Sequence, residues 1–205
     1  MPANVLQNAH RLGVLGGAFD PIHYGHLQIA EEARERFALD AVLFIPTGEP
    51  PHKPQGQAGA EQRFLMTELA TADNPCFAVS RLEIDRPGKS YTVDTLQTLK
   101  GQYPDAEIYL IMGADMAMDF STWREPEHIR SLARVVAVTR PGVREEALRR
   151  RLAAPAMRGI ELVVAPGIAL SSTEIRRRAC EGKSLRYLTP DAVIGFIEKE
   201  GLYRS

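Results

Sequence analysis

Cysteine and net charge are both scarce in this chain of 205 residues. The two cysteines, Cys76 and Cys180, are far apart, which disfavours a disulfide framework and a structural zinc site. The 25 basic residues nearly balance the 26 acidic ones, so no overall positive field would attract nucleic acid or an anionic membrane. The arginine runs at 149–151 and 176–178 are typical of solvated helix faces. We therefore expect neither nucleic acid nor a membrane as a partner.

Long apolar runs are also missing. The longest, such as 41–45 and 108–112, are far too short to span a bilayer, and residues 1–11 have no apolar stretch of the signal-peptide type. With so few cysteines, a reducing cytoplasm is the expected location. The 44% of apolar and 25% of charged residues are ordinary for a globular protein. We expect a single domain over 1–205, in which 171–205 could form a small C-terminal helical lobe.

Short apolar runs alternate with helical patterns along most of the chain. Six runs have the length and composition of buried strands: 12–15, 41–45, 77–80, 107–112, 133–138 and 162–165. Helical patterns lie between them, for example at 61–72 and 92–99. Near the C-terminus, Thr189 is predicted to cap a closing helix that has Pro190 at its first position and stops at Gly201. The alternation predicts an α/β fold with a mostly parallel sheet and helices on both faces.

One long segment, from Thr47 to Ala60, fits neither pattern because it is rich in glycine and proline. Loops of this length inside a compact domain tend to be functional or mobile. We expect this loop to close over a substrate.

The residues after the first predicted strand give the strongest functional signal. Gly16 and Gly17 allow a tight turn that a ligand can approach closely, and His23 and His26 stand at the entrance of the next helix. Nucleotides bind at this position in open parallel sheets. By themselves, two histidines three apart are more simply a capping and a surface residue. The whole string 16–26, GGAFDPIHYGH, resembles the G-x-F-D-P-x-H-x-G-H signature of the nucleotidyltransferase superfamily.

This resemblance implies a Rossmann-like nucleotide-binding fold with His23 and His26 in catalytic roles. It also implies ATP contacts from the turn, namely Gly16, Gly17, Ala18 and Phe19. Many members carry Ser or Thr where this chain has Ala18, so a backbone N–H would have to make the contact of the missing hydroxyl.

A second string, SSTEIR at 171–176, follows the last predicted strand. Ser171 with Glu174 three residues later forms a capping box, and a helix start alone accounts for the hydroxyls. The string is similar to the superfamily's second ATP-binding motif, S-S-T-x-I-R. That similarity implies a catalytic Arg176, whose fork of donors can hold phosphate. It also implies ATP contacts from Ser171, Ser172, Thr173 and Ile175.

Further strings resemble the nicotinate-nucleotide adenylyltransferase branch of this superfamily. PPHK at 50–53 implies that Lys53 lies close to the phosphates, although a lysine between prolines is usually a solvated loop residue. GAD at 113–115 implies ATP contacts from Gly113 and Asp115, for which an Asx turn at Asp115 is the simpler alternative.

The same branch has counterparts of SYTVDTL at 90–96 and of the aromatic segment 120–123. These imply an acceptor site that includes Thr92, Trp123 and Arg124. The alternatives are a helix cap for Thr92 and a core or rim position for Trp123.

The resemblance runs from Leu12 to Arg178 and implies an enzyme. In the implied reaction, the 5′-phosphate oxygen of nicotinate mononucleotide attacks the α-phosphorus of ATP, giving nicotinate adenine dinucleotide and pyrophosphate. Such transfers rely on in-line positioning and charge neutralisation, so no covalent intermediate is needed. Mg²⁺ is expected to arrive with ATP, held by phosphate oxygens and water, because no carboxylate cluster has obvious ligand spacing. We assign no residue as a metal ligand.

Two kinds of alternative stay open. The acceptor could be another phosphate, such as phosphopantetheine, or the chain could transfer a cytidylyl group from CTP; the strings around Thr92 and Trp123 argue against both. A nucleotide sensor without activity is the other alternative, because a fold does not establish chemistry. The sequence leaves the oligomeric state undecided, and a homo-oligomer is possible.

Overall fold

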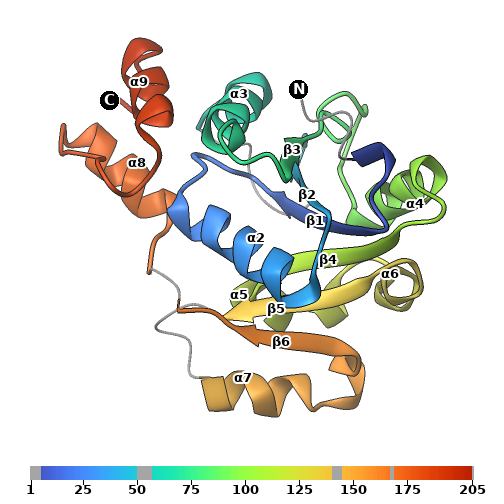
Figure 1. Cartoon of the computed structure of the whole chain (residues 1–205). Coiled ribbons are helices and arrows are strands. Elements are labelled where there is room, and N and C mark those ends of the chain that lie inside the picture. Colours follow the sequence, from blue (N-terminus) through green and yellow to red (C-terminus); the bar gives the residue numbers. More distant parts are fainter. Residues whose placement is uncertain (1–5, 50–56, 140–144, 167–168, 205) are drawn as a thin grey trace.

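Six parallel strands form the central layer of the protein in a computed structural model that describes residues 6–49, 57–139, 145–166 and 169–204 (Figure 1). The strands are β1 (Arg11–Gly17), β2 (Ala41–Pro46), β3 (Phe77–Val79), β4 (Glu107–Gly113), β5 (Arg134–Thr139) and β6 (Ile160–Val164). They are ordered β3-β2-β1-β4-β5-β6, and each neighbouring pair is parallel. All six predicted strands are present, and the predicted α/β fold with a parallel sheet is confirmed.

Helices connect the strands and cover the sheet on both faces (Figure 1). The α-helices are α2 (Tyr24–Phe37), α3 (Ala60–Thr71), α4 (Thr92–Gln102), α5 (Ala114–Met118), α6 (Pro126–Leu132), α7 (Glu145–Leu152), α8 (Ser172–Cys180) and α9 (Asp191–Lys199). Two short 3₁₀ helices are η1 (Phe120–Thr122) and η2 (Pro155–Met157). None of the helices in the described parts of the chain is both long and apolar enough to cross a membrane.

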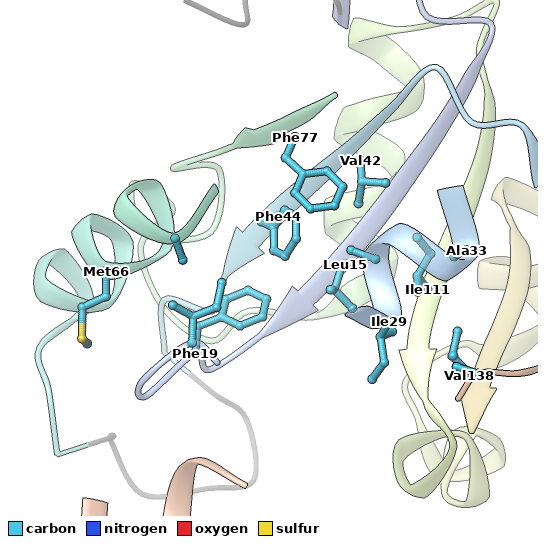
Figure 2. Packing of buried hydrophobic residues seen from close by; sticks show 14 of the residues in the cluster. Leu15, Phe19, Ile29, Ala33, Val42, Phe44, Met66, Phe77, Ile111 and Val138 are labelled. Atoms are coloured by element: carbon cyan, nitrogen blue, oxygen red, sulfur yellow. The ribbon is translucent and has the colours of Figure 1, made fainter. Parts of the chain in front are cut away.

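Two hydrophobic clusters hold the three layers together. On one face of the sheet, Leu15 and Phe44 pack with Ile29 of α2 and Met66 of α3, as Figure 2 shows. On the other face, the remaining apolar strand residues, among them Val14, pack against α4 and α6. Burial on both faces is the reason that these strands are continuous apolar runs in the sequence.

The strand order creates a switch point beside β1. The chain moves from β1 outward through β2 to β3, and then returns to place β4 on the other side of β1. Connections therefore diverge at the carboxyl ends of β1 and β4, which leaves a crevice where ligands bind in folds of this kind. The glycine turn at 16–17 stands at the end of β1, at this crevice.

The C-terminal helices α8 and α9 share the first of the two clusters. Ile175, Val193 and Ile197 are buried together with Leu15. This common core supports the prediction of one domain, which nevertheless stays a prediction, as does the helical lobe at 171–205.

The start of α9 differs from the sequence prediction. The cap is Pro190, and the helix begins at Asp191, so Thr189 does not cap it. The reason is a tertiary contact: the Thr189 hydroxyl is fully buried and donates a 2.8 Å hydrogen bond to the carbonyl of Ile22. The end agrees with the prediction, because Gly201 adopts the left-handed conformation (φ 62°) directly after the helix.

Candidate nucleotide-binding site

The turn after β1 is tightly packed. Phe19 is 2% exposed and has a left-handed backbone (φ 49°), which is uncommon outside glycine. Its ring lies so close to Gly17 that a Cβ there would meet ring atoms at 3.0 Å. Gly17 also accepts a 2.9 Å hydrogen bond from the N–H of Thr47. Ala18 is exposed and Gly16 is half-buried, so both are accessible at the end of β1.

The two histidines stack on each other at the start of α2. Their ring centroids are 3.7 Å apart, and the ring of Phe19 meets that of His26 edge-on at 5.1 Å. The backbone N–H of His23 donates to Nδ1 of His26 at 3.2 Å. Because Nδ1 accepts, a neutral His26 carries its proton on Nε2, which can then donate to a ligand.

The simpler alternative for the histidines holds only in part. His26 does have a capping contact through its Nδ1, but His23 is only 2% exposed and is not a surface residue.

The second string begins α8 with Ser171 as the N-cap, which is one half of the predicted capping box. The Ser171 hydroxyl accepts a 3.2 Å hydrogen bond from the N–H of Glu174. Thr173 is exposed in the first turn, whereas Ile175 is completely buried and packs in the core. Ile175 therefore lacks an exposed surface with which to contact ATP.

Arg176 is half-buried and reaches back to the first string. One guanidinium nitrogen donates a 2.7 Å hydrogen bond to the carbonyl of Asp20, and another donates to the Thr173 hydroxyl at 3.2 Å. These bonds use two of the five guanidinium N–H donors, which leaves three for other partners.

The two strings are joined along three consecutive carbonyls. Each carbonyl accepts one hydrogen bond from a side chain of the C-terminal segment: Asp20 from Arg176 at 2.7 Å, Pro21 from Ser172 at 2.9 Å and Ile22 from Thr189 at 2.8 Å. Ser172 and Pro21 are 151 residues apart in the sequence. The fold thus combines the two strings into one site, with the start of α8 beside the start of α2.

Asp20 is a further residue of this candidate site, beyond those predicted from the sequence. It is 4% exposed, and its carboxylate accepts from the N–H groups of Gln57 (2.8 Å) and Ala58 (3.2 Å) and from the hydroxyl of Tyr203 (2.6 Å). Burial, followed by the bond to Asp20, raises the pKa of the Tyr203 phenol. The string 16–26 contained the signal for Asp20, but nothing in the sequence pointed to Tyr203.

Arg63 is a second residue of this kind. It is 5% exposed and donates to the carbonyls of Ala18 (2.8 Å) and Thr47 (2.6 Å), so it joins the turn after β1 to the end of β2. Burial lowers the pKa of its guanidinium, against the opposing effects of Asp20 and Tyr203. A signal existed in the helical pattern, since Arg63 lies on the same face as the buried Met66 and Ala70.

Lys53 and the centre of the predicted loop lie outside the described residues, so their roles stay predictions. The described flanks, Thr47–Glu49 and Gln57–Gly59, are well anchored. A Cβ on Gly48 would lie 2.1 Å from the carbonyl oxygen of Glu83, so this position requires glycine.

The end of β4 lies beside the end of β1. Leu15 is paired with Ile111, and two residues further along, Gly17 and Gly113 end their strands at the same edge of the sheet. Gly113 caps α5, and Asp115 is exposed in the first turn of that helix.

Of the three predicted acceptor residues, Thr92 and Arg124 lie at the start of α4, and Trp123 directly precedes Arg124 in the chain. Tyr91 is the cap and Thr92 the first helical residue, so Thr92 is not the cap that the simpler alternative expects. The guanidinium of Arg124 lies 4.8 Å above the Tyr91 ring and 4.0 Å from the Asp94 carboxylate. Trp123 is half-buried against the second cluster, which is a rim position.

A buried carboxylate, Glu83, lies behind this helix. It is 7% exposed and accepts a 2.8 Å hydrogen bond from the Thr95 hydroxyl of α4. Burial raises the pKa of Glu83, while the Thr95 bond and the charge of Arg86 act in the opposite direction. No motif in the sequence pointed to a role for Glu83.

Within the described ranges, no group of three or more His, Cys, Asp or Glu side chains could hold a metal ion. The assignment of no metal ligand stays a prediction.

A sheet of this strand order, with a glycine turn and a helix start at its switch point, defines a Rossmann-like nucleotide-binding protein. The model of the cytidylyltransferase-like family matches residues 14–178. The chain belongs to this family and, within it, to the nicotinate-nucleotide adenylyltransferases.

Two relatives illustrate the similarity. A probable nicotinate-nucleotide adenylyltransferase from Corynebacterium kroppenstedtii is 49% identical over 197 residues, which cover 96% of this chain and 92% of the relative. One from Roseiflexus sp. is 50% identical over 195 residues, covering 94% and 98%. Among solved structures, the nicotinic acid mononucleotide adenylyltransferase of Plasmodium falciparum complexed with NaAD has a TM-score of 0.77 at 18% identity. That match covers 94% of this chain and 97% of the other, and it supports the fold.

Proposed function

We propose that this protein transfers the adenylyl group of ATP to nicotinate mononucleotide. The 5′-phosphate oxygen of the mononucleotide forms a bond to the α-phosphorus, and the bond from this phosphorus to the oxygen that bridges to the β-phosphorus breaks. Pyrophosphate leaves, and nicotinate adenine dinucleotide remains. The observation that carries the proposal is the junction of the two strings at the switch point, where Arg176 and Ser172 hold the carbonyls of Asp20 and Pro21.

The ATP phosphates are best accommodated between the starts of α2 and α8. Helix N-termini attract anions because their first N–H groups lack helical partners. His26 can donate from Nε2, and Arg176 retains guanidinium donors for phosphate oxygens. Lys53 is proposed to add a further positive charge. Together these groups neutralise charge that develops on the leaving pyrophosphate.

Other ATP contacts are proposed at the ends of β1 and β4 and at the start of α8. The residues are Gly16, Gly17, Ala18, Phe19, Gly113, Asp115, Ser171, Ser172 and Thr173. Phe19 and Ser172 act there mainly by holding the turn, because Phe19 is buried and the Ser172 hydroxyl donates to Pro21. The substrate is proposed to be Mg-ATP, with Mg²⁺ held by phosphate oxygens and water.

The acceptor is proposed to bind at the start of α4. The half-buried ring of Trp123 is proposed to stack on the pyridine ring. Arg124, the next residue, contacts Tyr91, which directly precedes Thr92. The site accordingly has one region for the phosphates of ATP and another for the mononucleotide.

One assay separates this proposal from its alternatives. The protein is mixed with Mg-ATP and either nicotinate mononucleotide, nicotinamide mononucleotide or phosphopantetheine, and pyrophosphate release is measured; CTP replaces ATP in a parallel series. We expect the fastest release with ATP and nicotinate mononucleotide. Release only with phosphopantetheine or CTP would assign another acceptor or donor. ATP binding in calorimetry without any release would identify a sensor.

We also infer a cytoplasmic location, supported by the scarcity of cysteine. Fractionation of cells that express the protein checks this inference, and its recovery with periplasmic or secreted proteins would contradict it.

A further inference from the structure

Tyr203 lies beyond the last helix and points back toward the first string. After α9, the N–H of Leu202 donates to the carbonyl of Ile197 at 3.0 Å, which is a Schellman turn with Gly201 at its left-handed position. Tyr203 itself has φ 63°, a conformation that non-glycine residues rarely adopt unless their surroundings enforce it. The result is a 2.6 Å hydrogen bond from the phenol to Oδ1 of Asp20, across 183 positions of sequence.

Asp20 connects three parts of the site. Its carboxylate accepts from the N–H groups of Gln57 and Ala58, which directly precede α3. Its carbonyl accepts from Arg176 of α8. In the described part of the chain, Tyr203 is the side chain that donates to the carboxylate, and the other two donors are backbone groups.

We propose that Tyr203 is a positioning residue for adenylyl transfer and that it acts through Asp20. Asp20 is only 4% exposed, and the phenol fixes the rotation of its carboxylate so that both oxygens face their backbone donors. The same fixed residue presents its carbonyl to Arg176. Without the phenol, the carboxylate keeps only its two backbone donors, so Asp20 and the flank at Gln57 are held less firmly. The turn whose carbonyl binds Arg176 then loses part of its support.

This inference rests on the proposed function, because it assigns Tyr203 a role in that reaction. The matched pair of variants is Tyr203→Phe and Tyr109→Phe. Tyr109 is also buried and also donates to a carboxylate, at 2.8 Å to Glu107, but at the amino end of β4, opposite the site. Its hydroxyl additionally accepts from Arg134. Both substitutions remove a tyrosine-to-carboxylate bond, and only one of these bonds lies at the site.

Two readouts test the proposal below the melting temperature of each variant. We expect Tyr203→Phe to lower kcat/KM for ATP roughly tenfold to a hundredfold, the effect of losing a hydrogen bond to a charged group. Hydrogen exchange at the amides of Gln57 and Ala58 should accelerate in the same variant. Tyr109→Phe should lower the melting temperature without either effect. Wild-type values of both quantities in Tyr203→Phe, or equal losses in Tyr109→Phe, would overturn the proposal.

The variant Asp20→Asn tests whether Tyr203 acts through Asp20. An asparagine NH₂ would face either the Gln57 or the Ala58 donor, so this variant should lose activity whichever way it turns. Adding Tyr203→Phe to it should then cause little further loss in kcat/KM, whereas additive losses would mean that Tyr203 acts elsewhere. If the wild type itself releases no pyrophosphate, the proposed function fails. The exchange rates of Gln57 and Ala58 still decide whether Tyr203 positions this flank.

Discussion

Arg176 donates a 2.7 Å hydrogen bond to the carbonyl of Asp20, 156 residues earlier in the chain. This contact gives the arginine two tasks, since it anchors the turn before α2 and retains donors for a phosphate. A change at Arg176 should consequently affect both the affinity for ATP and the rate of transfer, whereas an arginine on the outer face of the same helix should affect neither.

We expect Arg176→Lys to lower kcat/KM for ATP roughly tenfold to a hundredfold, with a raised KM and a reduced kcat. Lysine keeps the charge, but its single nitrogen cannot serve Asp20, Thr173 and a phosphate in the geometry of a fork. The loss corresponds to about 1.5–3 kcal/mol for hydrogen bonds to charged groups. Arg177→Ala is the control, because Arg177 is exposed and pairs with Glu174 and Glu181 on the helix surface. Steady-state kinetics of both variants check this prediction, and equal effects would contradict it.

Replacing His26 by Asn should separate its two contacts. The Asn side-chain oxygen lies the same number of bonds from Cβ as Nδ1, so it can still accept from the N–H of His23. The asparagine side chain has no atom at the position of Nε2, so the donor there is lost. Loss of a donor aimed at developing charge typically costs about 2.7–4 kcal/mol, so kcat should fall roughly a hundredfold to a thousandfold while ATP binding changes little. Single-turnover kinetics and calorimetry measure the two quantities; a variant with half the wild-type kcat would refute the role.

A third prediction concerns the acceptor. Trp123→Ala should raise KM for nicotinate mononucleotide and leave ATP binding nearly unchanged, because stacking on the half-buried ring is lost.

The wild type should prefer the nicotinate over the nicotinamide form about tenfold to a hundredfold or more in kcat/KM. A carboxylate only accepts hydrogen bonds and therefore suits backbone N–H donors around Arg124, whereas a carboxamide turned to present its NH₂ leaves a donor unpaired at a cost of about 1–3 kcal/mol. Equal kcat/KM for the two mononucleotides would argue against this acceptor.

The fourth prediction is a pH dependence of stability that originates at Glu83. Burial raises its folded-state pKa above the ordinary value of 4.5, so between these two pKa values the folded protein binds more protons than the unfolded chain. The free energy of unfolding must then fall as pH rises through this window. Glu83→Gln stays neutral and can still accept from Thr95, so its stability relative to the wild type should increase from pH about 4.5 upward. Urea unfolding at several pH values measures the difference in the free energy of unfolding between the variant and the wild type. A difference that stays constant with pH would contradict the prediction.

Two glycine substitutions should change stability in opposite directions. Gly48→Ala should destabilise the protein by about 1–3 kcal/mol, because its Cβ would lie 2.1 Å from the carbonyl of Glu83. Gly195 is exposed within α9, and a Cβ there would meet no atom within 4 Å. Gly195→Ala should therefore stabilise by about 0.5–1 kcal/mol. Thermal unfolding of the two variants checks both signs, and a stabilised Gly48→Ala would contradict the packing.

The sequence by itself determined the strands and the position of the candidate site. Strands that are buried on both faces must be apolar throughout, which is why β1, β2 and the others were recognisable as short runs. The string 16–26 was recognisable because a close turn and a helix start require particular residue types in a fixed order. The capping residue Ser171 was predictable for the same local reason. Lys53, which lies outside the described residues, remains a prediction from the string 50–53.

Only the tertiary structure decided which distant residues complete the site. Tyr203 and Asp20 meet across 183 positions, and no local pattern in the sequence records such a contact. Thr189 was predicted to cap α9, but its hydroxyl bonds the carbonyl of Ile22 instead, because a buried carbonyl must also find a donor. Local rules describe the hydrogen bonds that a segment can make with itself. Where a buried polar group of another segment competes for the same side chain, the folded arrangement of the whole chain determines the partner.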